Sequence, residues 1–205
     1  MKNPPLYQAH PWHGVSIGDD APAKVSAFVE ITPLDTIKYE IDKASGILKV
    51  DRPQKYSNIV PALYGFIPQT YCGEEVRKIS NASGSAAERG DGDPLDILIL
   101  TSHSIHHGNI LLKAIPIGGI SLVDKGEADD KIIAVLEGDA VYGSMNSIAD
   151  IPRGLLDKFQ HYFLTYKNLP NQSPTCAIQR IYDTPEAHSV IRASMEDYQG
   201  LFGVE

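Results

Sequence analysis

Runs of apolar residues, some continuous and some alternating, occupy the middle of the chain and predict β-strands. Residues 25–31 form a short apolar run, and residues 37–41 alternate between apolar and polar before a polar turn that ends in Gly46. Because a second apolar segment at 47–50 follows that turn directly, the pattern predicts a β-hairpin. Further strands are expected at residues 97–100, 110–117, 120–123 and 131–136.

Helical periodicity appears only late in the chain. One helix is expected to start near Asp150 and Pro152 and to bury a stripe at i, i+3/i+4 and i+7 spacing. The stripe consists of Leu155, Leu156, Phe159, Tyr162, Phe163 and Tyr166. A second helix is expected to have Thr184 as N-cap and Pro185 at its first position, to bury Val190, Ile191 and Tyr198, and to end near Gly200.

Strands followed by helices indicate a mainly β protein of the α+β class, with a small β-barrel and C-terminal helices packed outside it. The stretch from Cys72 to Gly92 is rich in Ser, Gly and Ala with scattered charges, and we expect a long mobile loop there. No repeat or linker divides the chain. Its 205 residues suit a single domain spanning positions 1–205.

Charge and composition narrow the class of function. The chain has 18 lysine and arginine residues against 26 aspartate and glutamate residues, a formal net charge of −8, which argues against a sequence-independent grip on nucleic acid. No segment has the length of a signal peptide core or a membrane span, so we expect a soluble cytoplasmic protein without a membrane partner. The cysteines Cys72 and Cys176 are expected to be free thiols.

An acidic cluster stands at the entrance of the strand at 97–100, where the chain reads Asp91-Gly92-Asp93-Pro94-Leu95-Asp96. Crowded carboxylates raise one another's pKa unless cations compensate them, and Mg²⁺ is the first candidate. Taken alone, the cluster also fits a solvated acidic turn. A calcium loop of the EF-hand type fails on spacing, because its fifth, sixth and twelfth positions would be Leu95, Asp96 and Ser102.

Residues elsewhere could supply what this cluster lacks. Lys38 and Glu40 leave the same face of a strand, and Arg52 has the planar fork that binds phosphate oxygens. Each of these also fits an ordinary solvated surface. The segment 124–131 adds a second acidic group with a lysine at the entry of the next strand. Tyr64 and Tyr166 are equally compatible with a site and with a core.

Together these pieces resemble family I soluble inorganic pyrophosphatase. The family signature Asp-x-Asp-Pro-x-Asp is intact at residues 91–96, and the remaining matches follow in order along most of the chain. They are Glu30, Lys38-Tyr39-Glu40, Asp51-Arg52, Pro61-Ala62-Leu63-Tyr64-Gly65, Asp124 with Asp129 and Lys131, and Tyr166-Lys167.

The resemblance implies an OB-type five-stranded barrel whose mouth binds several Mg²⁺ ions and pyrophosphate. It implies metal ligands at Asp91, Asp96 and Asp129, a further metal at Asp124, and one that arrives with substrate at Glu40. Asp93 would be the general base, and Glu30 would have a supporting acidic role. The phosphate oxygens would be held by Lys38, Arg52, Tyr64, Lys131, Tyr166 and Lys167. The resemblance also implies a homo-oligomer, commonly a hexamer in bacterial members.

Charge bookkeeping leads to a similar mechanism. The six carboxylates other than Glu30 and the four lysine and arginine groups named above give the site a formal net charge of about −2 without ligands. Pyrophosphate would add about −3 to −4, so about three divalent cations are needed. Two of them could lower the pKa of a water molecule, from which Asp93 would take a proton. We therefore expect direct attack by water without a phosphoenzyme. Oxygen ligands also accept Mn²⁺ or Zn²⁺ as substitutes for Mg²⁺.

Two features depart from this pattern. Val60 stands where the family often carries a tyrosine, and Tyr71 is a candidate to replace that phenol. The loop with His103, His106 and His107 permits adventitious metal binding, although no further ligand completes a tetrahedral set, and a solvated loop is our interpretation. His10 and His13, which flank Trp12, are expected to pack or cap.

Two other classes of function remain as alternatives. An OB-type module could bind nucleic acid without catalysis, but this chain concentrates aspartate where such a module needs basic and aromatic residues. A metal-dependent hydrolase of nucleotides or phosphate esters would share the metals but not the substrate. The chain has no Gly-rich phosphate loop of the P-loop type, which weakens the nucleotide version.

Overall fold

The 15-residue strand β7 (Ile110–Asp124) pairs with four other strands and organises the fold. These pairings are seen in a computed structural model, which describes residues 8–82, 84–167, 169 and 171–203. A closed ring runs through β1, β4, β6, β9, β7 and back to β1, so the strands form a five-stranded barrel. Their bounds are β1 Val25–Ile31, β4 Leu63–Phe66, β6 Asp96–Leu100 and β9 Lys131–Leu136. The predicted barrel is confirmed.

The strand β7 was expected as two strands, and that prediction is wrong. A register shift between Pro116 and Gly118 bends one continuous strand, so that its first half closes the barrel and its second half extends beyond it. The extension pairs with β10 (Cys176–Asp183), a strand that the pattern did not predict. Glycine is needed at position 119, because a Cβ there would lie 2.4 Å from the ring of Tyr182.

Both faces of β6 and β9 are buried. Alternate residues of β6 and β9 enter two different apolar clusters, as the two-residue side-chain period of a strand requires. Ile97 and Ile132 belong to a cluster that also contains Val190 of the last helix. Leu98 and Ile133 belong to the other cluster, which contains aromatic side chains of the preceding helix. Continuous apolar runs such as that at 97–100 follow from this double burial.

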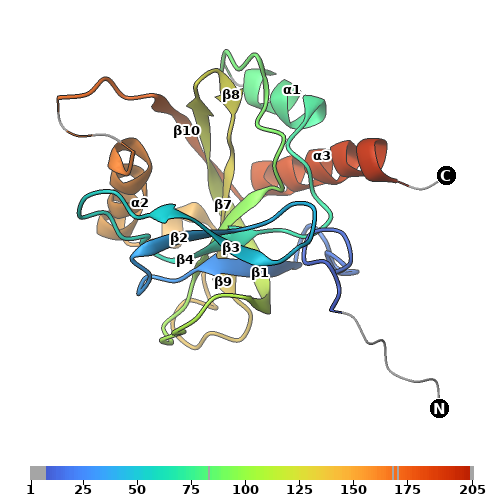
Figure 1. Ribbon diagram of the computed structural model, residues 1–205, viewed down its shortest axis with the longest axis horizontal. Coiled ribbons are helices and arrows are strands. Elements are labelled where there is room, and N and C mark those ends of the chain that lie inside the picture. Colours follow the sequence, from blue (N-terminus) through green and yellow to red (C-terminus); the bar gives the residue numbers. More distant parts are fainter. Residues whose placement is uncertain (1–7, 83, 168, 170, 204–205) are drawn as a thin grey trace.

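Helices cover the barrel from two sides (Figure 1). One side carries α2 (Arg153–Thr165), preceded by the short η1 (Ile148–Asp150), and the other carries α1 (Glu74–Ala82) and α3 (Thr184–Phe202). The helices predicted around Phe159 and Val190 are confirmed. Of the helices in the described ranges, none combines the length and the apolar character that a bilayer span needs.

The helix α1 contradicts the expected loop between Cys72 and Gly92. Its N-terminus is capped from outside: the Asp197 carboxylate on α3 accepts hydrogen bonds from the backbone N–H groups of Gly73, Glu75 and Val76 at 3.0–3.1 Å. An acidic side chain at a helix N-terminus satisfies free donors and interacts favourably with the helix dipole. Because this cap is 121–124 residues away in the sequence, the local pattern does not reveal it.

The start of α3 differs by one residue from the prediction. Asp183 is the N-cap and Thr184 is the first helical residue, with Pro185 in the first turn. The Thr184 hydroxyl lies within hydrogen-bond distance of the carbonyl oxygens of Ile117 and Asn146, at 3.0 and 2.7 Å, instead of capping its own helix. It therefore attaches α3 to the sheet.

The predicted hairpin is confirmed as a separate two-stranded sheet of β2 (Ile37–Ile41) and β3 (Leu48–Pro53). It lies across the barrel beside β1 (Figure 1). Two short strands, β5 (Arg89–Gly90) and β8 (Glu127–Ala128), pair in parallel and join the acidic turn to the end of β7. The hairpin and these short strands frame one end of the barrel.

Candidate active site

Parallel pairing of β6 and β9 brings the two acidic segments of the sequence together. Asp96 and Lys131 are register partners at the first positions of the two strands, so the turn at 91–96 and the segment 129–131 meet at one end of the barrel. Tyr64 on the neighbouring β4 reaches the same place, where its hydroxyl donates to the Asp96 carboxylate at 2.5 Å. Strand order alone thus assembles residues that are more than 60 positions apart.

We call Asp96, Asp129 and Lys131 the buried corner. The Lys131 ammonium pairs with both carboxylates, and its side chain is only 4% exposed. Burial disfavours the charged lysine, but Asp129 and Asp96 outweigh burial and raise the pKa of Lys131 well above its ordinary value. The ammonium therefore stays charged and bridges the two carboxylates.

Asp91 lies beside this corner and is hydrogen-bonded to Asp129. Burial, followed by the nearby Asp129 carboxylate, raises the pKa of Asp91 well above its ordinary value. Burial acts on Asp129 in the same sense, but Lys131 outweighs it and lowers the pKa of Asp129. The two carboxyl groups are hydrogen-bonded, and Asp91 is the one that takes up a proton more readily. A cation bound beside Asp91 would lower its pKa again.

Asp124 stands at the end of β7 with an unused oxygen. Its Oδ2 accepts from the Lys167 ammonium at 2.5 Å, whereas its Oδ1 is buried and has no hydrogen-bond partner among the described residues. Lys167 also lies over the Tyr166 ring, 5.0 Å from the centroid, and the Arg52 guanidinium approaches the same ring at 5.9 Å. Tyr166 therefore lies where the end of α2 meets the hairpin.

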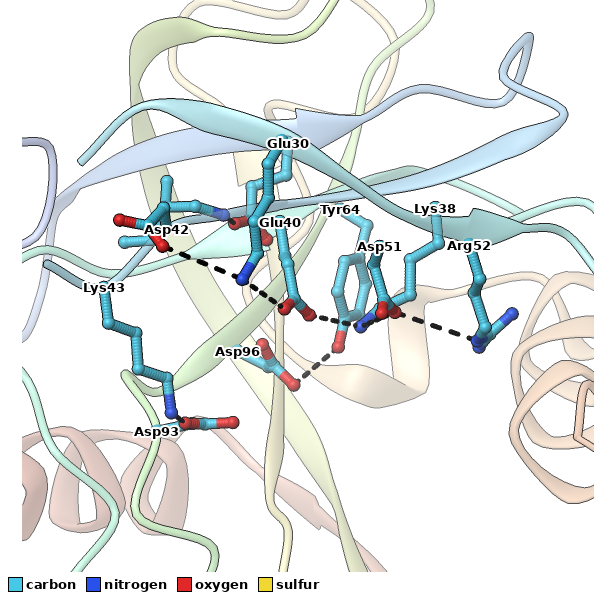
Figure 2. Close-up of polar contacts among 12 residues, drawn as sticks. Glu30, Lys38, Glu40, Asp42, Lys43, Asp51, Arg52, Tyr64, Asp93 and Asp96 are labelled. Atoms are coloured by element: carbon cyan, nitrogen blue, oxygen red, sulfur yellow. Dashed lines mark hydrogen bonds and ion pairs between the residues drawn. The ribbon is translucent and has the colours of Figure 1, made fainter. Parts of the chain in front are cut away.

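The hairpin contributes a more exposed group of charges. Lys38 donates to Glu40 at 2.9 Å and pairs with Asp51 at 3.0 Å, and Arg52 lies opposite Lys38 in the register of β2 and β3. Figure 2 shows these side chains in a row, with the Asp96 carboxylate below it. The predicted placement of Lys38 and Glu40 on one face of a strand is confirmed, and the structure adds the ion pair between them.

Lys43 is a contact of the acidic turn that the sequence did not indicate. Its ammonium pairs with the Asp93 carboxylate, and the two side chains are 56% and 49% exposed (Figure 2). We call Lys43 and Asp93 the open side. Lys43 lies 50 positions before Asp93, so only the tertiary structure brings them together.

Glu30 is buried beneath the hairpin. Its carboxyl Oε1 accepts from the backbone N–H of Ile41 at 2.7 Å, and burial raises its pKa to about 8. Glu30 also lines a cavity of about 100 Å³ between the hairpin and the acidic turn, together with Lys38, Glu40, Lys43, Tyr64, Asp93 and Asp96. The candidate residues of both segments therefore face one hollow.

The remaining candidates do not line this hollow. His103 and His106 line a different, largely apolar cavity of about 250 Å³ beyond the opposite ends of β4 and β6. Tyr71 packs on Phe202 with ring centroids 6.0 Å apart, and its replacement of a phenol at Val60 stays a prediction. His13 accepts from or donates to the Tyr198 hydroxyl at 2.8 Å, in keeping with the expected packing role. Cys72 and Cys176 are buried free thiols, as predicted.

Hard cations suit the donors present at this end of the barrel. Within the described residues no three acidic, histidine or cysteine side chains converge as a ready-made metal site. Nevertheless, the buried Oδ1 of Asp124, which has no partner among the described residues, and the raised pKa of Asp91 mark carboxyl groups that a cation would stabilise. The donor set fits Mg²⁺ better than a soft metal, because no thiol or imidazole takes part.

Fold and site together define a class: an OB-like barrel whose mouth combines carboxylates with lysine, arginine and tyrosine side chains. Comparison with known proteins specifies the family. The family model described as inorganic pyrophosphatase matches residues 27–199. This chain therefore belongs to the inorganic pyrophosphatase family.

Individual relatives agree with this assignment. An inorganic pyrophosphatase of Chlamydia muridarum is 51% identical, over 98% of this chain and the whole of the relative. A soluble inorganic pyrophosphatase of Oryza sativa subsp. indica is 37% identical over 96% of this chain and 82% of the relative. The crystal structure of the inorganic pyrophosphatase from Thermus thermophilus superposes with a TM-score of 0.77 at 29% identity, covering 94% of this chain and all of that one. The OB-type fold is thereby confirmed.

Proposed function

We propose that this protein hydrolyses inorganic pyrophosphate to two orthophosphates by direct attack of water, within a single domain. The observation that carries the proposal is the meeting of the 91–96 turn with Asp129 and Lys131 at the barrel mouth. Membership of the inorganic pyrophosphatase family supports the choice of substrate. A site rich in both carboxylates and basic groups suits an anionic substrate that arrives with cations.

Mg²⁺ is the proposed cofactor, with Mn²⁺ or Zn²⁺ as substitutes. When bound, it would lower the pKa of the attacking water and neutralise charge on the phosphate oxygens. Its ligands would come from the carboxylates at the mouth of the barrel. We assign this role to Asp91, Asp96, Asp129, Asp124 and Glu40.

Basic and phenolic groups would hold the substrate on both sides of those carboxylates. Arg52 and Tyr166 are adjacent, and the two-pronged guanidinium suits a terminal phosphate. Lys131 and Tyr64 lie deeper, beside Asp96. The full set is Lys38, Arg52, Tyr64, Lys131, Tyr166 and Lys167.

Asp93 would take the proton from the attacking water. Its carboxylate is half-exposed and lines the hollow, whereas Asp91 and Asp96 are engaged in the buried contacts described above. An ionised carboxylate within hydrogen-bond reach of the attacking water can act as a general base. Glu30, buried behind Glu40, would support the hairpin from below.

We further propose a cytoplasmic homo-oligomer, with a hexamer as the expected form, and no nucleic acid or membrane partner. The chain's net charge of −8 supports the exclusion of nucleic acid. Size-exclusion chromatography with light scattering would measure the oligomeric state. A monomeric mass at micromolar concentration would contradict the hexamer.

Phosphate release tests the proposed activity. The protein is incubated at equal concentration with pyrophosphate, ATP or a phosphate monoester, each with Mg²⁺ and with excess chelator. We expect rapid release from pyrophosphate with Mg²⁺ alone, and at least about 100-fold less from the other two substrates. Release from pyrophosphate that survives the chelator would refute the metal-dependent mechanism, and equal release from the monoester would indicate a general phosphatase.

A further inference from the structure

We infer that Lys43 is a positioning residue for Asp93, held in place by the N-terminal segment His10–His13; this inference rests on the proposed function. Among the described residues, the Asp93 carboxylate has one side-chain partner in a hydrogen bond or ion pair, and that partner is the Lys43 ammonium. A half-exposed aspartate on a turn samples several rotamers unless a partner selects one. Lys43 supplies that partner from the hairpin above.

The turn that carries Lys43 is itself well ordered. The Asp42 carboxylate accepts from the Ser45 backbone N–H at 3.0 Å and from the Ser45 hydroxyl at 2.8 Å, and the Gly46 N–H donates to the Asp42 carbonyl at 2.7 Å. These bonds close the β2–β3 connection on both sides of Lys43. The lysine side chain thus starts from a fixed backbone.

The N-terminal segment supports this turn from behind. The His10 Nδ1 accepts from the Trp12 backbone N–H at 3.2 Å, which places the ring proton on Nε2. His10 Nε2 then donates to the Lys43 carbonyl at 3.2 Å. Gly46 allows the close approach, because a Cβ there would lie 2.7 Å from Pro11 and 2.9 Å from the His10 ring.

The same segment also supports the acidic turn from below. Trp12 is buried, and its indole N–H donates to the Thr70 carbonyl at 2.7 Å. Thr70 Oγ1 accepts from the Leu95 N–H at 2.9 Å, within the turn that bears Asp93. The Cys72 N–H then donates to the Asp93 carbonyl at 2.8 Å. His10–His13 is therefore connected to both partners of the Lys43–Asp93 pair.

This arrangement gives Lys43 a role distinct from that of the substrate-binding lysines. Lys131 and Lys167 pair with candidate metal ligands, whereas Lys43 pairs with the candidate base. If Lys43 acts through Asp93, its loss lowers the probability that the base faces the attacking water. Turnover then falls while substrate binding changes little.

A double-mutant cycle separates the two roles. We measure kcat and KM for pyrophosphate with saturating Mg²⁺ in wild type, Lys43→Ala, Asp93→Asn and the double variant. We expect Lys43→Ala to lower kcat about 10-fold with KM within about 3-fold, and to add less than about 2-fold in the Asp93→Asn background. Lys43→Arg should restore kcat to within about 3-fold, because it keeps the ion pair.

Lys24→Ala is the matched control. Lys24 is also a surface lysine in an ion pair, with Glu137 at 2.9 Å, at the other end of β9 from Lys131. We expect wild-type kcat and KM for this variant, and unchanged unfolding midpoints for both alanine variants.

Three results would overturn the inference. The first is a kcat of Lys43→Ala within 2-fold (about 0.4 kcal/mol) of wild type. The second is a raised KM with unchanged kcat, which would make Lys43 a substrate contact. The third is a full Lys43→Ala effect in the Asp93→Asn background. An inactive wild type would instead refute the proposed function, so the two failures are distinguishable.

Discussion

The buried corner and the open side hold their charges in different ways. In the buried corner, Lys131 is 4% exposed and Asp129 is 15% exposed, so neither charge is tolerable without the other. On the open side, Lys43 and Asp93 are 56% and 49% exposed, and water screens their attraction. The fold therefore fixes the first group before any ligand arrives, whereas the second is accessible to solvent and to a ligand.

This difference suits two separate functions, cation binding in the buried corner and proton acceptance on the open side. Groups that bind cations benefit from being held together in advance, because the repulsion between Asp96 and Asp129 is already offset by Lys131. A group that accepts a proton during turnover must instead be able to change its partner. The position of Asp93 at the exposed edge of the turn agrees with that requirement.

The largest expected difference between the two regions is in stability. Lys131→Met keeps the volume of the side chain but leaves two partly buried carboxylates without their ammonium, and we expect the free energy of unfolding to fall by about 3–5 kcal/mol. Lys43→Met, on the open side, should cost less than about 1 kcal/mol, because its side chain is 56% exposed. Both variants should lose activity. Denaturant unfolding without metal measures the contrast, and equal midpoints would remove the distinction between the regions.

Glu30 tests how far burial extends beneath the hairpin. Its pKa in the folded state, about 8, lies above its ordinary value of 4.5, so the folded protein binds the proton more tightly. The stabilisation is complete below pH 4.5 and is lost as pH rises through 8. We expect metal-free wild type to lose on the order of 1–3 kcal/mol relative to Glu30→Gln between pH 5.5 and pH 8.

The amide of Glu30→Gln can still accept from the Ile41 N–H, so the backbone contact is preserved in that comparison. Thermal unfolding of both proteins across this pH range gives the measurement. If the unfolding midpoints of the two proteins changed with pH in parallel, the Glu30 carboxyl would be hydrated and the solvent-exposed region would extend beneath the hairpin.

A smaller effect is expected at Asp124, which belongs to neither region. Its buried, unpartnered Oδ1 is the proposed cation contact, and Asp124→Asn should raise the Mg²⁺ concentration for half-maximal activity about 10-fold, or about 1.4 kcal/mol. Mg²⁺ should also raise the unfolding midpoint of this variant less than that of wild type. Asp157→Asn, a surface change on α2 beside Arg153, is the control. The same Mg²⁺ dependence in both variants would exclude Asp124 as a ligand.

The periodicity of the chain was sufficient for most of the fold. Strands at 25–31, 37–41 and 131–136 have the predicted bounds, because each is an apolar or alternating run between polar turns. Failures occurred where distant residues decide the structure. Asp197 caps α1 from another helix, and β10 exists because the second half of β7 extends beyond the barrel to pair with it.

The site shows the same limit. A signature of aspartates with fixed spacing, together with matching residues in order, was enough to select the candidate set, and the strand register brings the main groups together. Lys43 was missed because a lysine in a polar turn is indistinguishable from a solvated charge. Its contact with Asp93 depends on how the hairpin folds over the barrel, which no local pattern records.

Asp93→Asn tests most directly whether the open side performs the chemistry. This change keeps the size of the side chain but removes its negative charge and its capacity to accept a proton, so kcat for pyrophosphate should fall at least about 100-fold while the unfolding midpoint stays unchanged. The measurement is steady-state phosphate release at saturating Mg²⁺, with thermal unfolding of the same samples. A variant that folds normally and retains wild-type kcat would contradict the assignment of Asp93 as the base.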